Sequence, residues 1–102
     1  MKSEELAQRM KANNPPCIVD VRTGFEYNSS HIPGALHAPA WKILLRMARL
    51  PKAKESELVV TCEMGPRARI AQKLLEKQGY RNVTLLDGHM SEWRRSGLPL
   101  EK

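Results

Sequence analysis

Three short apolar runs, separated by segments of helical periodicity, constrain the fold more than any other feature of the sequence. The runs Cys17–Val21, Leu58–Thr61 and Val83–Leu86 are rich in β-branched residues and too short to be typical helices. Mostly apolar runs of this length are typical of strands that are buried on both faces of a parallel sheet. Because helical segments alternate with them, the pattern predicts an α/β fold, a small doubly wound parallel sheet flanked by helices.

Apolar residues repeat at helical spacing in three of the segments beside these runs. Ser3–Ala12 is predicted to be a short helix with Ser3 as its N-cap and acidic residues in its first turn. Arg67–Gly79 is predicted to be a longer helix that ends at its glycine. Trp41–Leu50 is predicted to be a third helix, whose apolar stripe consists of Trp41, Leu44, Leu45 and Ala48. Tyr27–Pro39 has no period and is predicted to be an irregular loop.

The size and charge of the chain limit the classes of protein to which it can belong. Its 102 residues are a usual size for one domain, so we expect residues 1–102 to form a single domain. The net charge of +6 attracts anions, but aromatic residues are not interleaved with the basic ones, which argues against nucleic-acid binding. No apolar stretch is long enough for a signal peptide or a membrane span.

The only two cysteines, Cys17 and Cys62, do not form the dense pattern of a secreted disulfide-bonded domain. We therefore expect a reducing compartment and a cytoplasmic location. Cys17 begins a predicted buried strand and is interpreted as core packing. No metal is expected, because the three histidines have no metal-ligand spacing with either cysteine. These histidines are His31, His37 and His89.

Cys62 directly follows the predicted strand Leu58–Thr61 and precedes a turn and a helix. Ligands of open parallel sheets bind beyond the carboxyl ends of the strands. A free thiol is largely protonated at neutral pH, whereas the thiolate is the nucleophile, so the surroundings must favour a negative sulfur. The turn amides, the positive end of the next helix and the guanidinium of Arg67 can do this. Gly65 gives the turn conformational freedom, and Pro66 suits a first helical turn.

Five motifs occur in the order in which one known family has them. They are Ile18-Val19-Asp20-Val21-Arg22, Glu26-Tyr27, His31-Ile32-Pro33-Gly34-Ala35, the loop that begins at Cys62, and Gly88–Trp93. In these motifs, and over roughly Cys17–Pro99, the chain resembles the rhodanese family. The resemblance implies a parallel five-stranded sheet flanked by helices.

The resemblance also implies that the protein is a sulfurtransferase. In the family, a cysteine thiolate takes a sulfane sulfur from a donor such as thiosulfate, becomes a persulfide and passes the sulfur to a nucleophilic acceptor. Cys62 matches the catalytic cysteine. The residues expected to bind the substrate are Glu63, Met64, Gly65, Pro66, Arg67 and Ala68. Arg67 is expected to hold the sulfonate of thiosulfate, while the loop amides steady the anionic sulfur.

The remaining expectations concern the surroundings of this loop. Asp20 and Arg22 leave a strand end near the site, and we expect them to hold neighbouring loops by hydrogen bonds and ion pairs. A thiol or a sulfur-carrier protein is the expected acceptor, and no cofactor is implied. The basic face of the predicted helix Trp41–Leu50 is interpreted as solvated.

The sequence departs from the family pattern at two positions, and one acidic residue bears on the choice of donor. Ser30 and His89 stand where the family commonly has glycine, and neither change removes a catalytic group. Glu63 directly follows the predicted nucleophile. Its carboxylate would oppose both a thiolate and an anionic donor if it turned inward. Thiosulfate and a persulfide are therefore both possible sulfur donors.

Two other functions place a cysteine at the same point. One is a persulfide carrier or binding module that accepts sulfur from a partner protein and acts little on free thiosulfate. The other is a phosphatase or arsenate reductase, since cell-cycle dual-specificity phosphatases share the expected fold and a cysteine loop that ends in arginine. Their loops need five residues between cysteine and arginine. Here four residues separate Cys62 from Arg67 and the next position is Ala68, which disfavours this alternative.

Overall fold

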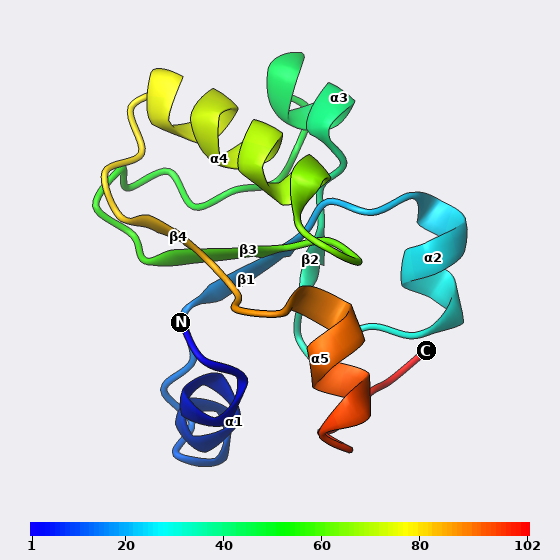
Figure 1. Ribbon diagram of the computed structural model, residues 1–102. Helices are drawn as coiled ribbons and strands as arrows, with labels where there is room; N and C mark the ends of the chain where they lie inside the picture. The colour runs from blue at the N-terminus through cyan, green and yellow to red at the C-terminus, as the bar shows by residue number, and fades with distance from the viewer.

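The computed structural model describes residues 1–102, and its strands form one parallel sheet (Figure 1). The strands are β1 (Cys17–Asp20), β2 (Leu36–His37), β3 (Leu58–Thr61) and β4 (Val83–Leu85), in the order β2-β1-β3-β4. The helices are α1 (Ser3–Lys11), α2 (Gly24–Ser29), α3 (Ala40–Leu44), α4 (Pro66–Lys77) and α5 (His89–Arg95). The predicted parallel α/β fold is confirmed. The sheet has four strands rather than five, because the C-terminal segment adds only an isolated antiparallel bridge between His31 and Glu101.

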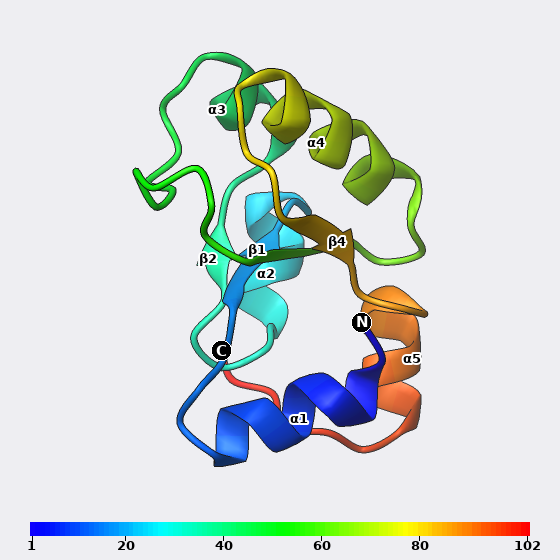
Figure 2. The same ribbon diagram turned by 90° about the vertical axis from the view of Figure 1, so that its left-hand side faces the viewer.

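Helices cover both faces of the sheet, as a doubly wound fold requires. α3 and α4 lie on one face, and α1 and α5 lie on the other (Figures 1 and 2). Successive strand residues point to opposite faces. Val60 therefore packs in one apolar cluster with Ala71 and Leu75 of α4, whereas Val59 packs in a second cluster with Trp93 of α5. The sheet separates these two halves of the core.

The predicted strands and the helices α1 and α4 are present, with ends that shift by one or two residues. Gly79 follows the C-cap of α4 with φ of 101°, so the predicted glycine end of this helix is confirmed. The prediction of Ser3 as an N-cap is wrong, because Lys2 holds that position. The Ser3 side chain is buried and its hydroxyl has no hydrogen-bond partner, so it caps no amide.

The helix predicted over Trp41–Leu50 is much shorter than expected. α3 ends at Leu44, because Arg46 turns into the left-handed region with φ of 57°. The amides of Arg46 and Met47 then bond back to carbonyls of the last helical turn, in the pattern of a Schellman motif. No glycine marks this end in the sequence, so the termination was not predictable from a turn residue.

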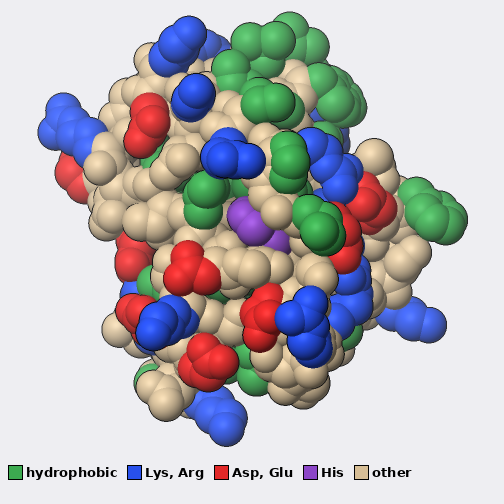
Figure 3. All heavy atoms as spheres, viewed as in Figure 1, with side chains coloured by type: hydrophobic (Ala, Val, Ile, Leu, Met, Phe, Trp, Pro, Cys, Tyr) green, Lys and Arg blue, Asp and Glu red, His purple; other side chains and the backbone are tan.

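Three of the four residues of the apolar stripe predicted for this helix lie on the surface, whereas Ala48 lies beyond α3 and packs partly buried against the core. Trp41, Leu44 and Leu45 are 54%, 60% and 61% exposed, and Ile43 is the buried residue of α3. Figure 3 shows hydrophobic side chains gathered over α3, with basic side chains beside them. Because the short helix packs through one side chain, the rest of its apolar residues face the solvent.

Two short elements overlap the segment that was predicted to be an irregular loop. α2 begins with a capping box, in which the side chains of Thr23 and Glu26 bond each other's backbone amides. β2 has two residues and pairs with β1. The run Thr23-Gly24-Phe25-Glu26 has the T-x-x-E pattern of a capping box, which is the sequence signal for α2.

Candidate active site

Cys62 lies where β3 ends, and the loop after it curls around the sulfur. The amide of Gly65 donates a hydrogen bond to Cys62 Sγ over 2.9 Å. Gly65 has φ of 126°, a conformation that residues with a Cβ rarely adopt, and it is the N-cap of α4. Pro66 follows as the first residue of that helix. The loop therefore directs a backbone donor and a helix N-terminus toward one sulfur atom.

Arg67 is held by Glu26 of α2. Its two terminal nitrogens donate to Glu26 Oε1 and Oε2 over 2.6 Å and 3.0 Å. These bonds lower the pKa of Glu26 to about 2 and raise the pKa of Arg67. The guanidinium is thus present beside the loop, and its charge is paired with the carboxylate of Glu26.

Glu63, the acidic residue next to Cys62, is turned outward. Its carboxylate accepts hydrogen bonds from both terminal nitrogens of Arg94 on α5, and Arg22 lies 3.6 Å away. The pKa of Glu63 is lowered, chiefly by the bond from Arg94. This negative charge is therefore balanced by two cations, Arg94 and Arg22.

Asp20 and Arg22 form a buried ion pair where β1 ends. Arg22 donates to Asp20 through its backbone amide and through Nε and a terminal nitrogen. The same guanidinium donates to the carbonyl of Ser30, over 2.7 Å. The pair therefore ties the end of β1 to the segment that follows α2, near the candidate site.

His89 is the residue of the site that the sequence reasoning missed. Its Nδ1 accepts a hydrogen bond from the Cys62 amide over 3.3 Å, and its ring lies against Gly65. Burial lowers the pKa of His89, which favours the neutral ring that such an acceptor requires. His89 also has φ of 51°, which explains why a glycine is common at this position in the family it resembles. The departure from glycine was the available signal.

The other loop residues differ in exposure. Met64 is exposed at the tip of the loop, whereas Ala68 is buried in the core cluster that contains Cys62. Cys62 itself is 0% exposed. A reagent therefore reaches the sulfur only after the loop or the side chains beside it move.

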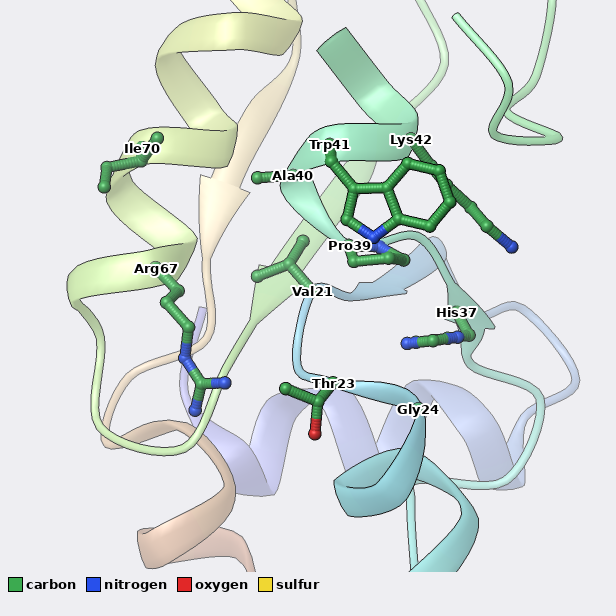
Figure 4. A pocket seen from close by; sticks show the side chains of 10 residues that line it. All are labelled: Val21, Thr23, Gly24, His37, Pro39, Ala40, Trp41, Lys42, Arg67 and Ile70. Atoms are coloured by element: carbon green, nitrogen blue, oxygen red, sulfur yellow. The ribbon is translucent and has the colours of Figure 1, made fainter. Parts of the chain in front are cut away.

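A cavity of about 460 Å³ lies next to Arg67 (Figure 4). Arg67 and Ile70 line one side, Trp41 lines the other, and Val21 lies between them. Val21 also packs in the core cluster with Cys62, so the cavity adjoins the wall of the candidate site. Cys62 does not line the cavity in this conformation.

The structure contains no group of three or more side chains of the metal-binding types. None of its helices has the length and apolar composition needed to cross a membrane. Cys17 and Cys62 are both free thiols, and partial burial raises the pKa of Cys17.

Comparison with known proteins gives one consistent family. The family model of the rhodanese-like domain matches residues 2–96. The chain is 38% identical over 98 residues to a sulfurtransferase of Allochromatium vinosum, covering 96% of this chain and 90% of that protein. It is 32% identical to a thiosulfate:glutathione sulfurtransferase of Saccharomyces cerevisiae, covering 92% of this chain and 76% of that protein. It is 30% identical to a putative sulfur carrier protein, YrkF, of Bacillus subtilis, covering 88% of this chain and 48% of that protein.

Solved structures give the same result. The Alr3790 protein of Anabaena superposes with a TM-score of 0.89 at 28% identity, over 99% of this chain and 81% of that one. A thiosulfate sulfurtransferase of Pseudomonas aeruginosa superposes with a TM-score of 0.87 at 26% identity, over 100% of this chain and 19% of that one. The whole chain therefore shares its fold with both structures. It matches most of the first protein and a small part of the second, which is much longer.

Proposed function

This chain belongs to the rhodanese-like domain family, and we propose that it transfers a sulfane sulfur from thiosulfate or a persulfide donor to a thiol acceptor through a persulfide on Cys62. The observation that carries the proposal is the bond from the Gly65 amide to Cys62 Sγ at the N-terminus of α4. A donor at 2.9 Å stabilises a negative sulfur, which both the thiolate and the persulfide present. Sulfurtransferases among the relatives support the same reaction class.

Loading of Cys62 and transfer to the acceptor are both nucleophilic displacements at sulfur. The Cys62 thiolate attacks the outer sulfur of thiosulfate, a new S–S bond forms, and the old bond breaks so that sulfite leaves with its electron pair. A thiolate acceptor then attacks the outer sulfur of the Cys62 persulfide. The S–S bond breaks, its electron pair returns to Cys62, and the acceptor leaves as a persulfide.

We assign the loop residues to the binding of the donor. The loop amides of Glu63, Met64, Gly65, Arg67 and Ala68 steady the charge on sulfur, and Pro66, which has no N–H, shapes the loop together with Met64. Arg67 binds the sulfonate of thiosulfate once Glu26 gives way. Asp20 and Arg22 keep the neighbouring loop in place.

A persulfide carrier with little activity on free thiosulfate is the second candidate. It is favoured by one observation, that Glu26 already occupies the guanidinium of Arg67, which a free anion would need. A sulfur carrier protein is also among the relatives. In this case the sulfur comes from a protein partner. For either function we propose a cytoplasmic, reducing setting, in which both cysteines stay free.

Mass spectrometry of the intact protein tests these functions. The protein is incubated with thiosulfate or with a cysteine desulfurase and its substrate, and then with a thiol. A gain of one sulfur atom from thiosulfate, lost again with the thiol, supports the enzyme, and a gain from the desulfurase alone supports the carrier. Cys62→Ser must gain none, and Cys17→Ser is the matched control that must gain as the parent does. If the parent gains no sulfur from either donor, both functions are refuted.

A further inference from the structure

The cavity beside Arg67 has an inner and an outer end (Figure 4). Arg67 lies at its inner end, and Val21, which packs in the same core cluster as Cys62, lies between Arg67 and Trp41. Its outer end is formed by Trp41 and Lys42, where the Lys42 ammonium points away from Arg67. A molecule in the cavity would therefore extend from the neighbourhood of the sulfur to a lysine at the rim.

The middle of the cavity is apolar. The indole of Trp41 and the side chain of Pro39 lie on one side, and Ile70 of α4 lies on the other. Trp41 is 54% exposed and Ile70 is 58% exposed, so both present apolar surface that the fold itself does not cover. A volume of about 460 Å³ is within the usual range of small-molecule sites.

The charges of the cavity are of one sign. Lys42 and Arg67 line it, and no aspartate or glutamate does. Lys42 forms no ion pair and lies 5.6 Å from the centre of the Trp41 ring. Glu26, whose carboxylate pairs with Arg67, does not line the cavity. The lining suits a molecule with an anionic group and disfavours a cationic one.

We propose that this cavity binds the sulfur acceptor, a small thiol with an apolar body and a carboxylate at its far end. The carboxylate lies at Lys42, the body covers Trp41 and Ile70, and the thiolate lies beside Arg67, next to the Val21 wall behind which Cys62 is buried. It reaches the sulfur when the loop after Cys62 moves. There it attacks the outer sulfur of the Cys62 persulfide and leaves as an organic persulfide, while the electron pair of the broken bond returns to Cys62. The role as an acceptor site rests on the proposed function, whereas the binding of the ligand does not.

Three thiols of equal length test the ligand class as acceptors of sulfur from persulfidated protein. They are mercaptohexanoate, mercaptohexanol and aminohexanethiol. We expect kcat/KM to be about fivefold higher for the carboxylate than for the alcohol, which corresponds to one partly exposed ion pair, and lowest for the amine. Equal values for the carboxylate and the amine would overturn the proposal.

Variants locate the effect. Trp41→Ala is expected to lower kcat/KM for mercaptohexanoate about tenfold, because the apolar body loses its wall. Leu45→Ala, which removes another exposed apolar side chain of the same region, leaves it unchanged. Lys42→Gln removes the preference for the carboxylate over the alcohol, and Lys73→Gln on α4 keeps it. A tenfold loss of kcat/KM in Leu45→Ala, or a loss of the carboxylate preference in Lys73→Gln, would refute the assignment of the cavity.

Binding without sulfur transfer separates this inference from the proposed function. Hexanoate has no thiol, and its binding to Cys62→Ser protein is followed by tryptophan fluorescence, since Trp41 is exposed and Trp93 is fully buried. A saturable change that weakens in Lys42→Gln supports the site, even if the parent transfers no sulfur and the proposed function fails. A parent that transfers sulfur but shows no change with hexanoate overturns the site alone.

Discussion

Replacing Glu26 with glutamine tests whether the ion pair with Arg67 competes with the donor. The pair joins two nitrogens of Arg67 to two oxygens of Glu26 across 41 positions of the chain. The side chains of Arg67 and Glu26 are 42% and 30% exposed, so solvent screens the pair, and we assign it about 1 kcal/mol. If thiosulfate must first displace Glu26, removing the charge lowers KM for thiosulfate by up to about fivefold.

The substitution is chosen so that little else changes. Glutamine is accepted at the third position of a capping box, so Glu26→Gln keeps the bond to the amide of Thr23 and with it the start of α2. Glu57→Gln is the matched control, because Glu57 pairs with Arg9 over 2.7 Å at similar exposure but away from the loop. Both variants are expected to lose no more than about 1 kcal/mol of unfolding free energy in urea.

Steady-state kinetics with thiosulfate and a fixed thiol measure the effect. KM falls in Glu26→Gln, stays at the parental value in Glu57→Gln, and kcat changes less than KM. Because the pKa of Glu26 is about 2, its carboxylate stays ionised in mild acid, so this part of KM does not change between about pH 7 and about pH 5. An unchanged or raised KM in Glu26→Gln would refute the competition.

Four further outcomes follow from the site. Cys62→Ser abolishes sulfur transfer and keeps the circular dichroism spectrum of the parent, since serine fills the same buried space. Arg67→Ala raises KM for thiosulfate about tenfold and changes the rate of Cys62 alkylation by iodoacetamide less; equal KM values would contradict its role. Gly65→Ala loses about 1–3 kcal/mol of unfolding free energy in urea, because φ is 126° and the new Cβ meets the His89 ring at 3.2 Å. The stabilisation from neutral His89 is present above its unfolded pKa of 6.5 and is lost as pH falls through the lower pKa of the folded protein. The free energy of unfolding therefore drops between about pH 7 and about pH 5. His89→Asn is expected to show a smaller drop, measured by urea unfolding at each pH.

The parts of the molecule that depend on neighbours in sequence were predictable. The three apolar runs formed strands, and Gly79 ended α4, because burial of a β-branched run and the freedom of glycine act locally. The position of Cys62 at a strand end followed from the same runs. The end of α3 was missed, because Arg46 adopts a conformation that glycine usually signals.

The contacts that control the candidate site were not predictable in this way. Arg67 meets Glu26, and the Cys62 amide meets His89, across many positions of the chain. No periodicity or turn signal encodes such pairs, because the topology of the sheet brings them together. The surface position of Trp41 has the same origin, since the packing of the neighbouring α4 decides which side chains of a short helix are covered.

The complete burial of Cys62 has a consequence for the proposed persulfide form of the protein. A second sulfur lengthens the side chain by about 2 Å, the length of an S–S bond, and a close-packed interior holds few voids of that size. If Cys62 carries a persulfide as we propose, loading pushes the loop outward, with the exposed Met64 at its tip. The surface of the loop would then differ between the protein with and without the second sulfur. A sulfur donor and a sulfur acceptor that contact this loop could therefore bind one form in preference to the other.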